Sequence, residues 1–305
     1  MYIKDYCVLR ITIFWLFVNL CLFLNCIQNE SPTVQYNRII SLAPSVTETL
    51  FVLGLGDKIV GVTNFCDYPE EARKIAKIGG YYDPNYEAIM ALKPDLIVML
   101  EEQETTKEYF NRIGLKSISV SHKTVKDNLH SIDTLGKFFK KEEFAQKLLL
   151  TMNRTIDTVR EQIMNSPHHT VLMTIGRSLE EVKNLYVVGN DEYYDEMITI
   201  AGGINAFKGG SVRYPMISFE GIMQINPDII IEIIAEMGGN TGSPEDYRKT
   251  WSKFNDIQAI RLNRIFYITE PYAVRPGPRF VLLIQDLAKI LHPEIPWGDV
   301  WRSLK

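Results

Sequence analysis

A segment of this chain occurs twice, 133 residues apart. The first copy begins at Glu87 and reads EAIMALKPDLIV, and the second begins at Glu220 and reads EGIMQINPDIII. The Glu, the Ile-Met pair, the Pro-Asp pair and one Ile of the apolar run are identical in both copies. A short helix, a Pro-Asp stop and an apolar strand are therefore encoded twice, which indicates two lobes with the same fold.

Short apolar runs alternate with amphipathic stretches from Arg38 onward. This alternation is typical of βα units that build a mostly parallel sheet. The candidate strands form two sets, 39–42, 59–62, 96–100 and 117–120 in the first half and 171–175, 185–188, 229–234 and 265–268 in the second. We therefore expect an α/β fold with two Rossmann-like lobes, each built around a mostly parallel sheet.

One long amphipathic stretch, 142–165, separates the two sets of strands. Its apolar residues recur at three- and four-residue steps, uninterrupted by Gly or Pro, at Phe144, Leu148, Met152, Ile156, Val159 and Ile163. At 1.5 Å per residue this helix would be roughly 35 Å long, enough to connect both lobes. The predicted domains are an N-terminal α/β lobe at 36–140, a connecting helix at 141–166 and a C-terminal α/β lobe at 167–305.

The helix after the first predicted strand has a candidate start signal. Ser45 and Glu48 have the spacing of a capping box. We therefore expect Ser45 to be the N-cap of this helix and Glu48 to bond back to its backbone.

The two repeated glutamates are expected in first helical turns. Glu87 and Glu220 each lie two residues after a good N-cap residue, Asn85 or Ser218. A carboxylate in that turn commonly does no more than complement the helix dipole, by ~0.3–1 kcal/mol. Its recurrence at equivalent places on two lobes instead favours a pair of acidic surface sites with a shared function.

The N-terminus has the pattern of an export signal, because two basic residues precede an uncharged apolar run at 11–24. We expect a signal peptide over 1–26, with an uncleaved anchor over 8–27 as the alternative. The sequence LFLNC, which ends at Cys26, resembles a bacterial lipobox and makes Cys26 a lipidation candidate, the alternative being an ordinary cysteine of the signal segment. The expected location is the periplasm, or a lipid anchor on the outer side of the cytoplasmic membrane.

Composition and missing motifs argue against several functional classes. The chain carries a formal charge of −4 and has no dense Lys/Arg run, which argues against nucleic-acid binding. It has no Walker A, GxSxG or HExxH sequence, and its five histidines lack the spacing of a metal site. We therefore expect no catalytic residues, no metal held directly by the protein and no intrinsic cofactor. An exported α/β enzyme that acts on a metal chelate is kept as an alternative.

Four motifs carry a resemblance to a known family, RIISLAPSVTETL at 38–50, VGVTNFCDYP at 60–69, AGGINAF at 201–207 and RPGPR at 275–279. They resemble the helical-backbone (class III) periplasmic binding proteins, which include the cobalamin, haem and ferric-siderophore receptors of ABC importers. The resemblance implies two lobes joined by one long helix, with the ligand in a shallow cleft. It also implies a monomer that delivers its ligand to a permease dimer with ATPase subunits. In that family a surface glutamate on each lobe pairs with arginines of the permease, and Glu87 and Glu220 occupy the matching positions.

The expected ligand site lies outside the carboxyl ends of the strands, where loops carry aromatic rings and arginines. Rings cover apolar area and guanidinium groups bind carboxylates bidentately, which suits a large, flat or anionic chelate. The candidate ligand-binding residues are Phe65, Tyr81, Tyr82, Arg177, Arg213, Tyr214, Tyr272 and Arg275. By resemblance, Phe65 and Tyr81 align with cleft aromatics of the cobalamin receptors and Arg275 aligns with a cleft arginine.

The chain departs from the cobalamin receptors at two positions. Tyr81 stands where a tryptophan is expected, and Leu100 stands where another is expected. We therefore favour an iron chelate, a ferric siderophore or haem, with cobalamin as the alternative ligand. Arg279, at the end of the RPGPR motif, is expected to be structural and to hold the last helix against the cleft.

Overall fold

The computed structural model describes residues 35–176, 184–190, 193–210, 212–234, 243–252 and 254–298. The chain divides into two compact units, Met1–Tyr36 and Asn37–Lys305, and every described helix and strand belongs to the second. The predicted signal peptide with Cys26 lies outside the described residues, as does Arg177. In the part that is described, no helix combines the length and hydrophobicity needed to cross a membrane.

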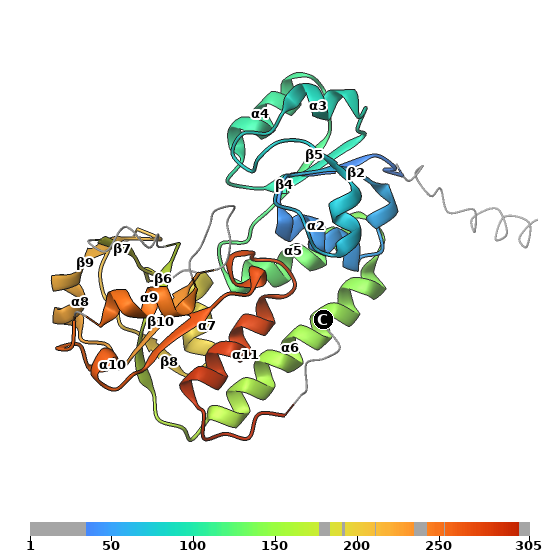
Figure 1. Ribbon diagram of the computed structural model, residues 1–305. Helices are drawn as coiled ribbons and strands as arrows, with labels where there is room; N and C mark the ends of the chain where they lie inside the picture. Colours follow the sequence, from blue (N-terminus) through green and yellow to red (C-terminus); the bar gives the residue numbers. More distant parts are fainter. Residues whose placement is uncertain are drawn as a thin grey trace, which may run out of the picture. The chain divides into compact units, whose positions relative to one another are not determined.

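The N-terminal lobe is built around a five-stranded parallel sheet with the strand order β3-β2-β1-β4-β5 (Figure 1). The strands are Ile39–Ser41 (β1), Ile59–Val62 (β2), Ala76–Lys77 (β3), Leu96–Leu100 (β4) and Ser117–Val120 (β5). The helices are Pro44–Val52 (α2), Tyr86–Ala91 (α3), Glu104–Arg112 (α4) and Val125–Phe138 (α5), with 3-10 turns at Gly56–Lys58 and Glu70–Lys74. Ile40, Ile97 and Phe110 belong to its fully buried core. The four strands predicted for this half are confirmed.

The C-terminal lobe is built around a parallel sheet whose described strands have the order β11-β10-β6-β8. These strands are His169–Ile175 (β6), Gly203–Asn205 (β8), Ile229–Ile233 (β10) and Ile265–Ile268 (β11). The helices are Tyr193–Ile200 (α7), Phe219–Ile225 (α8), Pro244–Trp251 (α9), Gln258–Arg261 (α10) and Phe280–Leu291 (α11), with a 3-10 turn at Pro271–Val274. Together the two lobes form an α/β fold with mostly parallel sheets, as predicted.

One strand predicted for the second half does not enter the parallel sheet. The segment 185–188 corresponds to β7 (Asn184–Tyr186), which pairs antiparallel with β9 (Met216–Ser218). The position beside β6 is taken by β8 instead. Strand β8 has only three residues, one of them a glycine, so it carries no apolar alternation that a sequence pattern could detect.

The two sheets share one strand order, which confirms the repeated fold. The order β2-β1-β4-β5 in the first sheet corresponds to β8-β6-β10-β11 in the second, and the repeated segment supplies α3 with β4 and α8 with β10. In both copies the Asp of Pro-Asp accepts backbone hydrogen bonds from the start of the neighbouring strand. Asp95 accepts from Asn37 (2.7 Å) and Arg38 (3.0 Å), and Asp228 accepts from Thr170 (2.9 Å).

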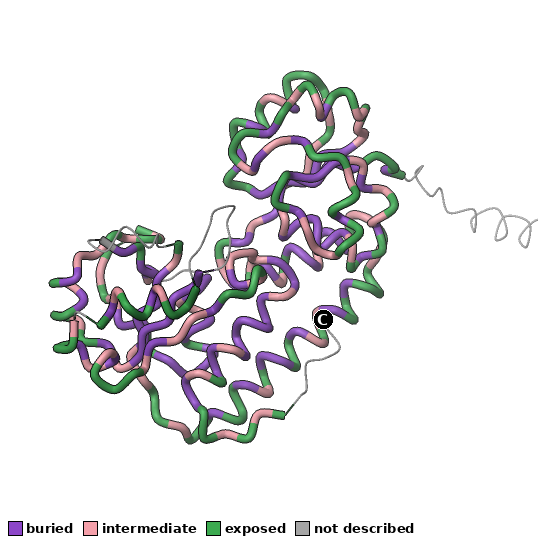
Figure 2. The backbone as a smooth tube through the Cα atoms, in the orientation of Figure 1, coloured by how far each residue is buried: buried purple, intermediate pink, exposed green. Residues whose placement is uncertain are grey.

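A single helix, α6 (Glu142–Ile163, 22 residues), joins the two lobes. It packs on α2 and α5 of the N-terminal lobe and on α7 and α11 of the C-terminal lobe, and it lies beside α11 in Figure 1. Figure 2 shows buried residues recurring along both helices, and those of α6 are Ala145, Leu148, Met152, Thr155, Ile156, Val159 and Ile163. Of the predicted apolar face only Phe144, in the first turn, is exposed, with the ammonium group of Lys141 over its ring at 5.4 Å.

The capping box predicted at Ser45 and Glu48 is wrong. Helix α2 begins at Pro44 with Ala43 as its N-cap, two residues before the predicted N-cap, and no side chain caps it. Proline suits this first helical position. Both predicted capping side chains instead bond to groups outside the helix, Ser45 to His122 and Glu48 to Arg279.

His122 forms a buried polar connection between α2 and α5. Its Nδ1 lies 3.0 Å from Oγ of Ser45, and its Nε2 lies 2.8 Å from Oγ of Ser131. Burial lowers the pKa of His122 to about 3, so the folded protein keeps this ring neutral around neutral pH.

We expect acid to destabilise the protein through His122. Between the ordinary histidine pKa of 6.5 and the folded value of about 3, the unfolded chain binds a proton that the folded chain does not. The free energy of unfolding therefore falls as the pH falls through this range. The variant His122→Gln should remove this contribution, up to about 1.4 kcal/mol per pH unit, from the slope measured by urea unfolding between about pH 7 and pH 5. The control His130→Gln, at an exposed histidine of the same helix, separates the effect of His122 from the loss of any histidine of α5. An unchanged slope in His122→Gln would contradict the assignment.

Candidate functional site

Three acid–arginine pairs connect the N-terminal lobe to the C-terminal lobe within the described ranges. In each pair the carboxylate belongs to the N-terminal lobe and the guanidinium to the C-terminal lobe, as Glu48–Arg279, Asp67–Arg275 and Glu102–Arg213. With the acid given first, the exposed fractions of the side chains are 3% and 13% in the first pair, 37% and 12% in the second, and 31% and 35% in the third. The pairs thus extend from the protein interior to the surface.

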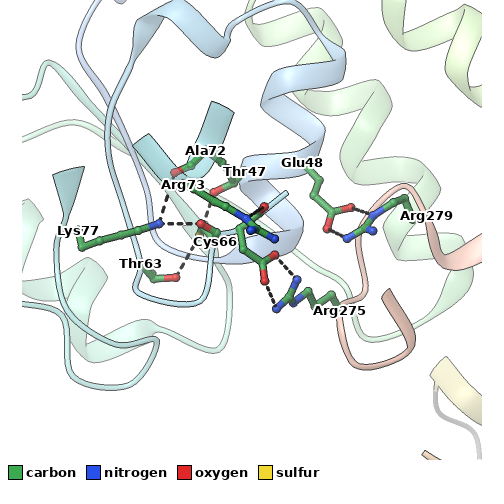
Figure 3. Close-up of polar contacts among 10 residues, drawn as sticks. Thr47, Glu48, Thr63, Cys66, Ala72, Arg73, Lys77, Arg275 and Arg279 are labelled. Atoms are coloured by element: carbon green, nitrogen blue, oxygen red, sulfur yellow. Dashed lines mark hydrogen bonds and ion pairs between the residues drawn. The ribbon is translucent and has the colours of Figure 1, made fainter. Parts of the chain in front are cut away.

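The innermost pair, Glu48–Arg279, is bidentate. Nε of Arg279 donates to Oε2 of Glu48 (2.9 Å), and Nη2 donates to Oε1 (2.6 Å) (Figure 3). The guanidinium also stacks on the ring of Tyr68, 3.7 Å from the ring centre. Burial alone would lower the pKa of Arg279, but the hydrogen bonds and charge of Glu48 more than offset burial and raise it. Burial also raises the pKa of Glu48, although the hydrogen bond and charge of Arg279 oppose this rise. The bidentate geometry, with two guanidinium nitrogens donating to the two oxygens of one carboxyl group, identifies the pair as ionised. This agrees with the structural role expected for Arg279.

Asp67 and Arg275 form a second bidentate pair (Figure 3). Nη2 of Arg275 donates to Oδ2 of Asp67 at 2.9 Å, and Nη1 donates to Oδ1. The loop that carries Asp67 is itself held through its backbone, because Arg73 donates to the Asp67 carbonyl (3.1 Å) and Lys77 donates to the Cys66 carbonyl (2.6 Å). The guanidinium of Arg275, predicted to bind ligand, is thus bound to a carboxylate of the opposite lobe.

The turn that carries both arginines is fixed by other elements as well. Asn128 of α5 donates to the carbonyl of Pro276, and Tyr194 of α7 donates to that of Ala273 (2.7 Å). A Cβ atom at Gly277 would lie 3.0 Å from Oε2 of Glu48, so glycine allows the turn to pack closely on α2. The fold therefore positions both arginines independently of any ligand.

The outermost pair, Glu102–Arg213, is looser than the other two. Its nearest nitrogen and oxygen atoms are 3.7 Å apart, beyond hydrogen-bond distance. Tyr81 lies near this pair, and its pKa is raised by burial and then by the charge of Glu102. Tyr82 packs edge-to-face on Tyr81 with ring centres 4.7 Å apart and is almost fully exposed. The structure thus brings together three of the predicted ligand residues, Tyr81, Tyr82 and Arg213.

The other described candidates have different surroundings. Phe65 and Tyr214 are both partly exposed, and the ring of Tyr214 contacts that of Tyr194 with centres 6.3 Å apart. The hydroxyl of Tyr272 donates to Asp286 of α11 at 2.5 Å, so this tyrosine is held against the last helix. Tyr272 lines a groove of about 590 Å³ together with Tyr68, Tyr267, Arg279, Leu282 and Lys289.

The acidic partners Glu48 and Asp67 are absent from the predicted site, although both lie on the motifs at 38–50 and 60–69. The signal that could have found them is charge balance. Arginines that a fold buries need counter-charges, and the acidic residues after the N-terminal strands are available for that purpose. A prediction that selects rings and arginines as ligand contacts does not consider which carboxylates balance the charges of those arginines.

No group of three His, Cys, Asp or Glu side chains that could hold a metal ion occurs among the described residues. Cys66 is a buried thiol whose Sγ lies 3.2 Å from Oγ1 of Thr47 and 3.1 Å from Oγ1 of Thr63. Burial raises the pKa of this thiol, so it is held in the neutral, unreactive form.

Glu87 and Glu220 are exposed in the first turns of α3 and α8. The predicted N-caps are confirmed, because the side chains of Asn85 and Ser218 each accept a hydrogen bond from the backbone three residues later, at 2.9 and 3.3 Å. The backbone N–H of Glu220 and the hydroxyl of Ser218 lower the pKa of Glu220. Neither glutamate forms an ion pair with a described residue, so both carboxylates are accessible to a partner.

We expect loss of one partner of the innermost pair to destabilise the protein. Arg279→Met leaves the buried carboxylate of Glu48 without its counter-charge and should lower the free energy of unfolding by about 3 kcal/mol in urea titrations. The double variant Glu48→Leu with Arg279→Met removes both charges and should recover most of this loss. Equal destabilisation in the single and double variants would show that the attraction between the charges is not what stabilises this contact.

Comparisons with known proteins agree with this fold. A family model described as periplasmic binding protein matches residues 39–272. An uncharacterized ABC transporter substrate-binding lipoprotein, YvrC of Bacillus subtilis, is 27% identical over 277 residues, which cover 87% of this chain and 84% of YvrC. The vitamin B12-binding protein of Vibrio campbellii is 26% identical over 254 residues, which cover 83% of this chain and 88% of that protein.

A solved structure gives the same result. The crystal structure of a possible iron-binding (periplasmic solute-binding) protein from Staphylococcus epidermidis superposes with a TM-score of 0.72 at 27% identity, covering 85% of this chain and 99% of that one. The family model matches well over half of the chain, and the strand order of both sheets and the long helix α6 fit the same architecture. The chain belongs to the periplasmic binding protein family.

Proposed function

We propose that this chain is the extracytoplasmic substrate-binding protein of an ABC importer, which captures an iron chelate and delivers it to the membrane permease. Family membership supports the class, as do relatives named for ABC transporter substrate binding and vitamin B12 binding. These relatives are binding proteins, and three buried ionisable groups, Glu48, Cys66 and His122, are each held in internal contacts. The protein is therefore assigned to binding, not catalysis.

The edge formed by Arg213, Tyr81 and Tyr82 is the observation that carries the ligand class. The side chain of Arg213 is about one-third exposed, so part of its guanidinium is accessible to a ligand. A ligand carboxylate or other paired oxygen donors would bind Arg213 bidentately. Tyr81 and Tyr82, which lie at the same edge, would cover apolar area of the ligand. An anionic chelate with a flat or apolar body meets both requirements.

An iron chelate, a ferric siderophore or haem, fits these features better than cobalamin. The Staphylococcus epidermidis protein of the same fold is named as a possible iron-binding protein. The described tryptophans are not in the cleft, since Trp251 is fully buried in the C-terminal core and Trp297 donates to the carbonyl of His292. Cobalamin is kept as the second candidate ligand because of the vitamin B12-binding relative.

Ligand titrations test this assignment. We expect the full chain to bind ferric siderophores or haem, measured by calorimetry and by quenching of intrinsic fluorescence. Arg213→Gln should weaken binding of the anionic chelate about tenfold, because a charge-assisted bidentate contact is lost, and should leave cyanocobalamin binding unchanged. The control Arg261→Gln removes an exposed arginine at the end of α10 and should have no effect. Tight binding of cyanocobalamin alone would replace the iron chelate by cobalamin, and binding of none of these ligands would contradict the importer assignment.

Glu87 and Glu220 are proposed as the permease-docking residues. They are exposed and lie at equivalent positions of two lobes that share one strand order. Two equivalent acidic sites suit a partner with two basic subunits, and such charges orient docking more than they add affinity. The permease dimer with its ATPase subunits is the proposed partner, and the binding protein is proposed to act as a monomer.

The double variant Glu87→Ala with Glu220→Ala should abolish uptake of the chelate by cells while ligand affinity in vitro stays as in the wild type. Docking requires the two carboxylates, whereas the ligand site does not contain them. Glu108→Ala, which removes an exposed glutamate of α4, serves as the matched control and should support normal uptake. A loss of ligand affinity in the double variant would place these glutamates in the cleft instead.

Export and domain boundaries complete the proposal. We propose a signal peptide over 1–26 and keep Cys26 as the lipidation candidate, which in a lipoprotein would become the first residue of the mature chain. The proposed location is the periplasm or the outer side of the cytoplasmic membrane. The lipoprotein name of the Bacillus subtilis relative supports the anchor. The proposed boundaries are 36–140 for the N-terminal lobe, 141–166 for the connecting helix and 167–305 for the C-terminal lobe, and the bounds of α6, Glu142–Ile163, support this division.

A further inference from the structure

Each repeated segment exposes a methionine one helical turn after its glutamate. Met90 of α3 is 43% exposed and Met223 of α8 is 38% exposed. Residues three apart on a helix lie on the same side, so each methionine is a neighbour of the docking glutamate of its own lobe. The two accessible carboxylates are thus accompanied by two accessible apolar side chains.

Most identical positions of the two copies have a structural cause. Ile89 and Ile222 are fully buried in the cores of their lobes. Asp95 and Asp228 accept backbone hydrogen bonds from the neighbouring strands. The fold therefore requires these residues, and their recurrence needs no functional explanation.

The exposed positions behave differently. Four positions are exposed in both copies, 87 with 220, 90 with 223, 91 with 224, and 93 with 226. The last two pairs differ, as Ala91 with Gln224 and Lys93 with Asn226. Lys93 and Asn226 even share a left-handed backbone, with φ of 46° and 47°, and still differ in sequence. Among the exposed positions only the Glu and the Met are the same in both copies.

We propose that Met90 and Met223 are contact residues of the docking surface, each filling an apolar hollow next to the basic side chain that pairs with its glutamate. This inference rests on the proposed function. A large apolar side chain in water is common on protein surfaces, but the same one recurring beside the same carboxylate on two lobes is not explained by the fold. Methionine is enriched in protein–protein interfaces, where it adapts to irregular apolar surfaces. The two equivalent contacts match a partner that presents two copies of one subunit.

Stimulation of ATP hydrolysis by the full-chain binding protein tests the proposal, with the purified permease–ATPase complex of the same bacterium in proteoliposomes. The concentration of binding protein that gives half-maximal stimulation reports docking. Met90→Gln and Met223→Gln, nearly equal in size to the native residue, should each raise this concentration about fivefold, and the double variant more than tenfold. Ligand affinity and thermal stability should be unchanged. The double variant with leucine at both positions keeps the apolar contact and should stay within about twofold of the wild type.

Salt separates the two kinds of contact. The defect of the methionine variants should be equal at low and high salt, whereas the defect of Glu87→Gln with Glu220→Gln should shrink as salt screens the ion pairs. Met164→Gln, at the 75% exposed methionine that follows α6, is the matched control and should dock normally.

If the glutamate variants fail to dock and the methionine variants dock normally, the proposal is overturned and the proposed function stands. If the glutamate variants also dock normally, the docking part of the proposed function fails as well. Self-association that is lost in the methionine variants, measured by light scattering, would assign this surface to a second copy of the chain and overturn the proposal.

Discussion

Glu48 and Arg279 carry opposite charges that can be buried only as a pair, and the contact between the lobes depends on this pair. Each would be costly to bury alone, because an unpaired charge in the interior loses its hydration without compensation. With the pair formed, the turn that carries Arg275 and Arg279 lies close to α2, where a Cβ atom at Gly277 would be 3.0 Å from Oε2 of Glu48. The second pair, Asp67–Arg275, follows from the same placement, since both arginines belong to one short turn.

The inner pairs also determine which groups are left for a ligand. Arg275 and Arg279 are bound to carboxylates of the opposite lobe, so the guanidinium proposed to meet an anionic ligand is that of Arg213, whose side chain is about one-third exposed. The rings of Tyr81 and Tyr82 lie at the same edge. The proposed chelate is therefore expected to bind near the protein surface, while the two inner ion pairs hold the lobes together. This separation lets the ligand change without a change in how the lobes are joined.

The sequence alone predicts most of the architecture and only part of the site. Strands, the connecting helix α6 and the N-caps Asn85 and Ser218 follow from local patterns of apolar residues and side-chain caps, which short segments carry completely. Strand β8 is too short to show such a pattern. The pairs Glu48–Arg279 and Asp67–Arg275 join residues 231 and 208 positions apart, so no local motif contains both partners. The capping box at Ser45 and Glu48 was predicted wrongly for the same reason. The local pattern is visible in the sequence, whereas the distant partners of these two side chains, His122 and Arg279, are not.

The lobes share a strand order but not the charges that they present to each other. All three carboxylates of the connecting pairs belong to one lobe and all three arginines to the other. Two copies of the N-terminal lobe placed in this arrangement would bring carboxylate against carboxylate, which repel strongly when water is excluded. The repeat in the backbone and at Glu87 and Glu220 is thus broken where the two halves meet. One chain with two unlike halves can therefore present different side chains to the two sides of a ligand, while its surface still presents the same exposed residue twice, at Glu87 and Glu220.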